Sequence, residues 1–179
     1  MADLYHHGVK GQKWGRRKPK EAPHVKSGTK TITTKTKYGD ELKMQGEPTP
    51  GIAKFLAKHS KGYRDRVNNS NFYSLKDKAG NVVGEMQTFK ESKDSLNVVW
   101  VGTNESARGK GYASAAMRGA VNAAKKQGLK KVTLEVPGNS PDARHIYEKM
   151  GFKAKNAISS TDDIWGGLTE MELNLNKKH

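Results

Sequence analysis

The chain has 179 residues, no cysteine and a formal net charge of +15. This length suits one ordinary α/β domain with a tail, and the absence of cysteine excludes disulfides and thiolate zinc sites. No apolar run is long enough to span a bilayer and no signal-peptide core follows Met1, so we expect a protein that is neither secreted nor bound to a membrane. The positive charge favours acidic partners such as phosphate groups, nucleic acid or an acidic protein face, although a solvated lysine-rich surface is the simpler explanation.

Residues 1–18 are basic, carry glycine at short intervals and show no sustained hydrophobic period, so they cannot bury enough apolar surface to fold alone. We therefore predict a flexible docking segment and linker over residues 1–26 and one folded domain over residues 27–179. The segment resembles the His-Gly-Val-Lys-Gly-Met-Lys-Trp-Gly-type segment of structural and head-associated proteins of tailed bacteriophages, with Gln12 in place of the methionine. That resemblance implies a phage-encoded protein, in the virion or the host cytoplasm, that docks on the capsid or another head protein through Trp14. The alternative is a tail without a role.

The first elements of the folded domain are a hairpin and a helix. Alternation of threonine with lysine over Thr29–Lys37 predicts an exposed strand, and a turn at Gly39 leads into a second strand, Glu41–Met44. Residues 50–61 predict an amphipathic helix, because apolar residues recur there at i, i+3, i+4 and i+7. The residues of that face are Ile52, Phe55, Leu56 and His59, of which we expect the histidine to lie at the edge of the core.

The next strands form a second hairpin and extend the sheet. Phe72–Lys76 and Val82–Lys90 are rich in strand-forming residues and flank the polar turn Asp77–Asn81, which predicts a hairpin. Ser95–Val101 then continues the sheet.

A βαβ unit follows. An alanine-rich helical pattern from about Ala113 to Gln127 lies between the strand Ser95–Val101 and a second strand, Lys131–Val136, so we expect these two strands to be parallel and adjacent. Ligands of such units bind at the carboxyl ends of the strands. The stretch Arg108–Ala113 falls there, and its two glycines, its cations and the N-terminus of the next helix favour a phosphate site. Glycine turns that serve packing alone are the alternative.

This half of the chain resembles the GNAT family, the Gcn5-related N-acetyltransferases. In that family an Arg/Gln-x-x-Gly-x-Gly/Ala loop precedes a helix, and Arg108, Gly111 and Ala113 match it. The family then places an asparagine after the next strand and an Ala-x-x-x-Tyr-x-x-x-Gly-Phe helix after that. The matching residues are Asn139, Ala143, Tyr147, Gly151 and Phe152.

The resemblance implies an α/β fold of the α+β mixed-sheet kind. Its central sheet should be mostly antiparallel, contain one parallel pair of splayed strands and be flanked by helices. We expect Ile164-Trp165 and Glu170–Leu175 to supply the last pair of strands.

The resemblance also implies the chemistry, which is transfer of an acetyl group from acetyl-CoA to an amine without a metal. Backbone N–H groups of the glycine loop would hold the pyrophosphate, and the splayed strands would admit the pantetheine arm. Tyr147 would protonate the departing sulfur, because its hydroxyl is protonated at neutral pH. The residues implied to bind the cofactor are Val99, Val101, Arg108, Gly109, Lys110, Gly111, Tyr112, Ala113, Asn139 and Tyr147.

The general base is where this chain departs from the family pattern. Many members carry a glutamate on the strand before the glycine loop, whereas Leu96–Val101 contains no carboxylate. Glu85 on the preceding strand and Glu135 on the following one are substitute catalytic candidates, acting directly or through water. The alternatives are that both are surface carboxylates and that the amine arrives already neutral.

Two functions from different classes are consistent with these features. The first is an acetyl-CoA-dependent N-acetyltransferase acting on an amine of a protein, with polyamines, antibiotics and nucleobase amines less favoured. The second is a non-catalytic virion-associated module that keeps the fold and uses its basic tail to bind capsid or nucleic acid. The missing strand carboxylate favours the second, and the glycine loop together with Asn139 and Tyr147 favours the first.

Overall fold

The computed structural model describes residues 31–59, 61–158 and 167–176. The tail predicted over residues 1–26, with its phage-like segment, lies outside them. Eight strands form one sheet in the order β1-β2-β3-β4-β5-β6-β8-β7. The strands are β1 (Ile32–Lys35), β2 (Glu41–Glu47), β3 (Ser70–Lys76), β4 (Val82–Lys90), β5 (Ser95–Thr103), β6 (Lys131–Pro137), β7 (Lys153–Ile158) and β8 (Leu168–Asn174). The helices are α1 (Gly51–His59), α2 (Lys61–Asn68), α3 (Tyr112–Lys126), α4 (Pro141–Lys149) and the short 3₁₀ helix η1 (Glu105–Ala107).

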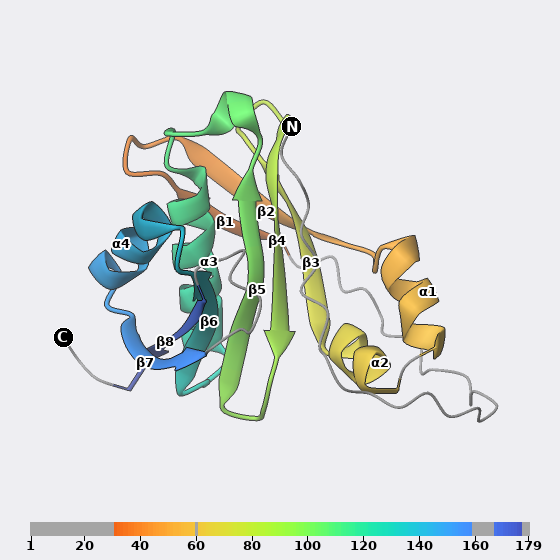
Figure 1. Ribbon diagram of the computed structural model, residues 1–179. Helices are drawn as coiled ribbons and strands as arrows, with labels where there is room; N and C mark the ends of the chain where they lie inside the picture. The colour runs from red at the N-terminus through yellow and green to blue at the C-terminus, as the bar shows by residue number, and fades with distance from the viewer. Residues whose placement is uncertain (1–30, 60, 159–166, 177–179) are drawn as a thin grey trace.

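The sheet is mixed, as the sequence predicts. Neighbouring strands of the described residues pair antiparallel except β5 and β6, which are parallel and joined by the crossover helix α3. Helices α3 and α4 lie on one side of the sheet, and α1 and α2 lie on the other (Figure 1). The predicted fold class is therefore confirmed.

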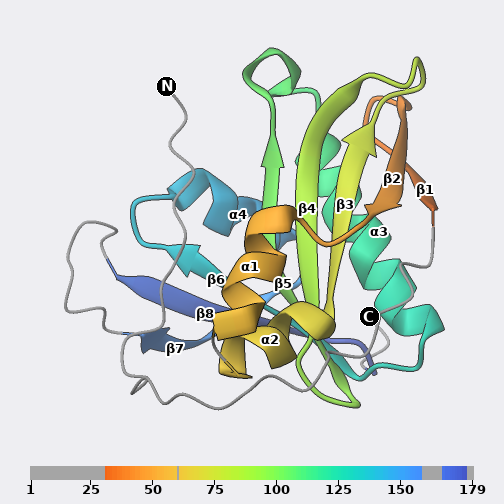
Figure 2. The same cartoon turned by 90° about the vertical axis from the view of Figure 1, so that its right-hand side faces the viewer.

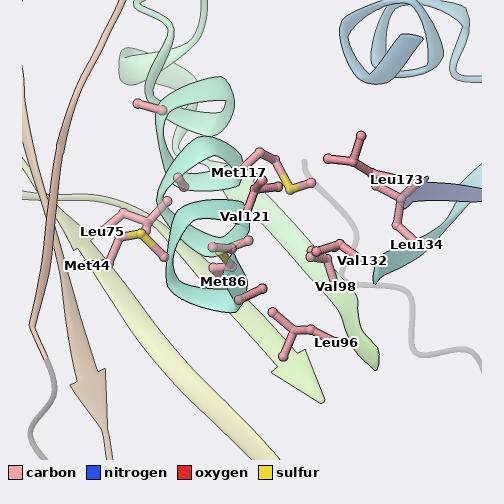
Figure 3. Packing of buried hydrophobic residues seen from close by; sticks show 14 of the residues in the cluster. Met44, Leu75, Met86, Leu96, Val98, Met117, Val121, Val132, Leu134 and Leu173 are labelled. Atoms are coloured by element: carbon pink, nitrogen blue, oxygen red, sulfur yellow. The ribbon is translucent and has the colours of Figure 1, made fainter. Parts of the chain in front are cut away.

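The main core lies between the sheet and α3. The predicted inner face of that helix is buried, with Ala116, Ala120, Val121 and Ala124 all at most 7% exposed. Figure 3 shows side chains of α3 among those of the strands. A Cβ added at Gly119 would lie 2.7 Å from Sδ of the buried Met44, so small residues are what allow α3 to pack this closely on the sheet.

The helix predicted over residues 50–61 forms, but its predicted apolar face is wrong at Phe55 and His59. The segment forms α1 and the start of α2, and it buries Ala53 and Ala57 in a small cluster with Val67. Phe55 is 60% exposed, and its ring packs on exposed His59 with a centroid distance of 4.8 Å. The side chains of Ile52 and Leu56 lie outside those that the structure describes, and Ala53 and Ala57, which the pattern did not mark, form the described buried side of α1.

The last pair of strands also differs from the prediction. Both edges of β8 are occupied, one by β6 and the other by β7, a strand that was not predicted. Residues 164–165 lie outside the described residues. Glu172 on β8 joins the three strands, because Lys131 on β6 and Lys155 on β7 each place Nζ 3.0 Å from its carboxylate. The sequence of β7 alternates lysine with alanine and asparagine, which gives a weak strand signal.

Candidate active site

The sheet divides at the parallel pair. Pairing between β5 and β6 runs from Ser95–Lys131 to Val98–Leu134 and then stops, although both strands continue. Beyond that point β5 stays paired with β4 as far as Thr103, while β6 stays paired with β8 as far as Pro137. Figure 2 shows β6 and β8 running at a steep angle to β5. The facing edges of β5 and β6 therefore offer backbone groups that have no partner on the opposite strand.

A β-bulge lies at the point of division. On β4, Gln87 is opposite Trp100 and the next residue, Thr88, is opposite Val98, so Val99 is the extra residue. The bulge reverses the side-chain alternation of β5. Val98 faces the core, and after the bulge Val101 packs against the core while Trp100 faces the opposite side of the sheet.

The glycine loop has the backbone geometry of an anion site. Gly109 and Gly111 have φ of +74° and +79°, a region that suits glycine. Gly111 is the N-cap of α3 and provides no side-chain hydrogen bond to the helix. The first intrahelical bond is donated by Ala115 N–H to the Gly111 carbonyl, so the N–H groups of the first turn are left for a ligand.

The β1–β2 hairpin is held against this helix terminus. Arg118 on α3 donates from Nη2 to the Lys35 carbonyl over 2.9 Å. A Cβ at Gly111 would lie 3.6 Å from Cβ of Thr36, so the turn after β1 and the glycine loop are in near contact. This packing brings Lys37 to the same surface as Arg108.

A cleft of about 810 Å³ extends from the glycine loop along α3 and α4 to the end of β8. Its walls include Thr103 at the end of β5 and Leu173 near the end of β8. Neither aspartate nor glutamate is among the described residues that line it. The cationic lining side chains are Lys37, Arg108, Arg118, Lys125 and Lys149, and His145 lies with them. The cleft therefore fits an elongated anion.

The structure brings together some of the predicted cofactor residues. Arg108, Gly109, Gly111, Tyr112 and Ala113 line the cleft, with the Tyr112 side chain buried in the core. The others lie around it. Lys110 is exposed on the loop, Val99 and Val101 lie on β5 beyond the division, exposed Asn139 follows β6, and Tyr147 lies on α4.

Four of the cationic residues that line the cleft were not predicted from the sequence to lie at the site. Arg118, Lys125 and Lys149 lie on the outer faces of their helices, and the i, i+7 spacing of the first two was a signal that they share a face. Lys37 comes from the distant hairpin, and nothing in the local sequence indicates that it reaches α3.

Tyr147 is half-buried against the core, with its ring centroid 5.9 Å from that of Phe152. Burial raises the pKa of its phenol above the ordinary value. No hydrogen bond to its hydroxyl occurs among the described residues. The group therefore remains protonated at neutral pH.

Glu85 and Glu135 are both exposed and flank β5 on the side opposite α3. Glu85 on β4 is opposite Gly102, and Glu135 on β6 comes directly after the last residue that pairs with β5. Among the described residues, no three His, Asp or Glu side chains are grouped so as to hold a metal ion. No helix in the described ranges is long and apolar enough to cross a membrane.

A divided sheet beside an uncapped helix terminus and a basic cleft is an arrangement suited to an elongated anionic ligand. The sequence model of the acetyltransferase (GNAT) family matches residues 41–152, more than half of the chain, and the protein belongs to that family. It is thus an acetyltransferase of the GNAT type.

Among curated proteins, the chain is similar to the uncharacterized N-acetyltransferase YycN of Bacillus subtilis (strain 168). The two are 29% identical over 139 residues, which cover 73% of this chain and 87% of YycN.

Among solved structures, the fold is similar to the spermidine N-acetyltransferase of Vibrio cholerae in complex with CoA and spermine. The TM-score is 0.59 at 16% identity, covering 76% of this chain and 96% of that one. Mutant forms of the spermidine/spermine N-acetyltransferase SpeG of Vibrio cholerae give a TM-score of 0.58 at 16% identity, covering 75% and 95%. At 16% sequence identity, the similarity to these structures establishes the fold alone.

Proposed function

We propose that the protein transfers the acetyl group of acetyl-CoA to a primary amine of a protein. The observation that carries the proposal is the continuity of the basic cleft with the uncapped start of α3 and the divided edges of β5 and β6. The pyrophosphate fits the N–H groups of Tyr112, Ala113 and Ser114. The amides of the pantetheine arm suit the unpaired strand edges, and Asn139 lies at the end of β6 to help orient them.

The chemistry then needs two proton transfers. The amine nitrogen attacks the thioester carbonyl, a C–N bond forms, and the C–S bond breaks as the tetrahedral intermediate collapses. Tyr147 gives its phenolic proton to the departing sulfur, which suits a group that burial keeps protonated. Glu85 or Glu135, directly or through water, accepts the proton that the amine loses.

The acceptor and the setting are further parts of the proposal. A lysine side chain of a host or virion protein offers the primary alkyl amine that this reaction needs, and the named substrate of the Vibrio cholerae neighbour, spermidine, offers the same group. The basic segment of residues 1–18 would dock the enzyme on a phage capsid or another head protein, with nucleic acid as a second acidic partner. Removal of residues 1–18 should abolish incorporation into phage particles, and unchanged incorporation would contradict this docking role.

A non-catalytic module is the second candidate. One observation favours it, namely that β5 provides no carboxylate and both substitute glutamates are exposed. Such a module would bind capsid or nucleic acid and would have no need for Tyr147.

Calorimetric titration with acetyl-CoA, followed by mass spectrometry of lysates incubated with it, separates the two candidates. If the protein is an enzyme, it binds acetyl-CoA and yields acetylated products. The Arg108→Gln variant should then bind acetyl-CoA more weakly than the parent. Lys126→Gln is the matched control, because Lys126 neighbours Lys125 on α3 but does not line the cleft. Absence of acetyl-CoA binding by the parent protein would rule out the enzyme.

A further inference from the structure

Trp100 is a large aromatic side chain left exposed beside the division of the sheet. It is 44% exposed, although it lies in the middle of β5. A Cβ added at Gly102 would lie 2.9 Å from Cζ2 and 3.2 Å from Nε1 of the indole, so this edge of the ring lies directly against that glycine. Any larger residue at 102 would push the indole away from the strand.

The bulge at Val99 places this indole on the side of the sheet away from the cofactor cleft. Trp100 pairs with Gln87, whereas its neighbour Val101 pairs with the buried Met86 and faces the core below α3. The cleft is lined by residues of α3 and α4, and Figure 1 shows these two helices together on one side of the sheet. The arm of a cofactor bound in the cleft would enter the gap between β5 and β6 from the α3 face of the sheet. An acceptor bound beside Trp100 would reach the same gap from the opposite face.

A carboxylate lies next to the indole. Glu85 on β4 is opposite Gly102, the residue that the indole contacts, and residues paired across two strands present their side chains on the same face. An exposed π face beside a carboxylate is suited to a primary alkylammonium, whose methylenes lie on the ring while the charge meets both groups.

We propose that Trp100 is the platform that binds the acceptor, and that the acceptor is a primary alkylammonium carried on a flexible methylene chain. This inference rests on the proposed function and names the substrate class of the same site. Trp100 holds the methylene chain and Glu85 attracts the charged end, so that the amine is presented at the point where β5 and β6 part. A lysine side chain and a polyamine share this chemistry.

The first test measures acetyl transfer by the full chain to two probes, spermidine and a lysine peptide with a blocked N-terminus. We expect Trp100→Leu to raise the KM of the preferred probe about tenfold and Trp100→Phe to raise it less, because leucine keeps apolar bulk but lacks a π face. The Kd for acetyl-CoA should stay at the parent value. Preference between the probes distinguishes a protein acceptor from a small polyamine.

Phe55→Leu is the matched control, since Phe55 is an exposed aromatic outside β5, on α1, a helix on the same side of the sheet (Figure 2). Its KM should equal that of the parent. An unchanged KM in Trp100→Leu overturns the platform, and so does failure of the parent to acetylate either probe while it binds acetyl-CoA. Failure of the proposed function has a different signature, namely no binding of acetyl-CoA at all.

A second measurement needs no substitution at Trp100. The chain has three tryptophans, so the variant Trp14→Phe/Trp165→Phe leaves Trp100 as its single indole. Adding the preferred probe to the CoA-bound variant should shift or quench its fluorescence in a saturable way, and an unchanged spectrum overturns the proposal.

Discussion

Val98 lies opposite Leu134 in the last parallel pair of β5 and β6, and the residue after Val98 is bulged out of the pairing with β4. The same point in the chain therefore opens the sheet and reverses which side chains face the core. Val98 and Trp100 are two residues apart and still face opposite sides of the sheet, because Val99 is bulged; if the same residues ran as an unbulged strand, Trp100 would continue the buried series of Leu96 and Val98.

Deletion of Val99 tests this relationship. The deletion leaves Val98 opposite Thr88 and Trp100 opposite Gln87 in regular alternation, so the indole keeps its face of the sheet while β5 loses the local bend that a bulge imposes. We expect acetyl-CoA binding to weaken about tenfold in calorimetric titration, because β5 loses the bend that accompanies its parting from β6 after Val98. Val99→Ala keeps the bulge and should leave acetyl-CoA binding near the parent value, so equal damage in both variants would argue against a role for the extra residue.

The glycine loop gives a second prediction. Gly111 has φ of +79°, and a side chain there costs about 1–2 kcal/mol of backbone strain as well as crowding the approach to the first turn of α3. Gly111→Val should therefore weaken acetyl-CoA binding at least tenfold in calorimetric titration. Gly128→Ala is the control, because Gly128 has φ of +72° at the far end of α3 and carries the strain without touching the site. Normal binding by Gly111→Val would show that the backbone there does not approach the ligand.

Gly111 and Lys37 illustrate what the sequence could and could not predict. The loop, α3 and the parallel pair are encoded locally, by glycines between a strand pattern and an alanine-rich helix, and all three form as predicted. Lys37 reaches the cleft only because distant contacts hold the hairpin on α3. The bulge at Val99 is likewise set by pairing with β4 rather than by its own residue type, because valine is an ordinary strand former. What the local sequence could not predict thus depends on tertiary contact.

The length of the basic cleft leads to a third prediction. CoA carries a phosphate on its ribose in addition to the pyrophosphate, and the cleft continues from the glycine loop to Lys125, near the other end of α3, and to Lys149 on α4. We expect CoA to bind about 3- to 10-fold more tightly than 3′-dephospho-CoA, as solvent-exposed charge pairs allow. Lys125→Gln combined with Lys149→Gln should remove this preference, whereas Lys126→Gln should retain it. Equal affinities of the parent for both ligands would place the ribose phosphate outside the cleft.

Tyr147 gives a fourth prediction, which separates catalysis from packing. Tyr147→Phe keeps the ring contact with Phe152 and removes a hydroxyl that has no hydrogen-bond partner among the described residues. We expect kcat to fall about 100-fold, as for loss of a general acid, while the Kd of acetyl-CoA and the thermal midpoint stay nearly constant. A parent-like kcat would remove Tyr147 from the reaction and leave water as the proton donor.

The buried phenols also predict how stability depends on pH. Burial raises the pKa of Tyr73, with a smaller opposing effect from its hydrogen bond with Thr88, and burial raises the pKa of Tyr147. Below about pH 10, the ordinary tyrosine pKa, both phenols are neutral in the folded and unfolded chains, and their full contribution to stability is present. Above that pH the unfolded chain ionises first, so the free energy of unfolding should fall until the folded phenols ionise as well.

Urea unfolding at a series of pH values from 8 to about 11 measures this loss. The slope of the free energy of unfolding against pH is set by the number of protons that the folded state retains and the unfolded state has lost. The double variant Tyr73→Phe/Tyr147→Phe should show a shallower decline, because it lacks two of the phenols whose pKa burial raises, while Tyr112, whose pKa burial also raises, remains. Tyr38→Phe, which removes a phenol that is 63% exposed, should decline as the parent does. If the double variant and the parent lose stability equally, the alkaline transition arises from other groups, such as lysines in ion pairs, rather than from burial of Tyr73 and Tyr147.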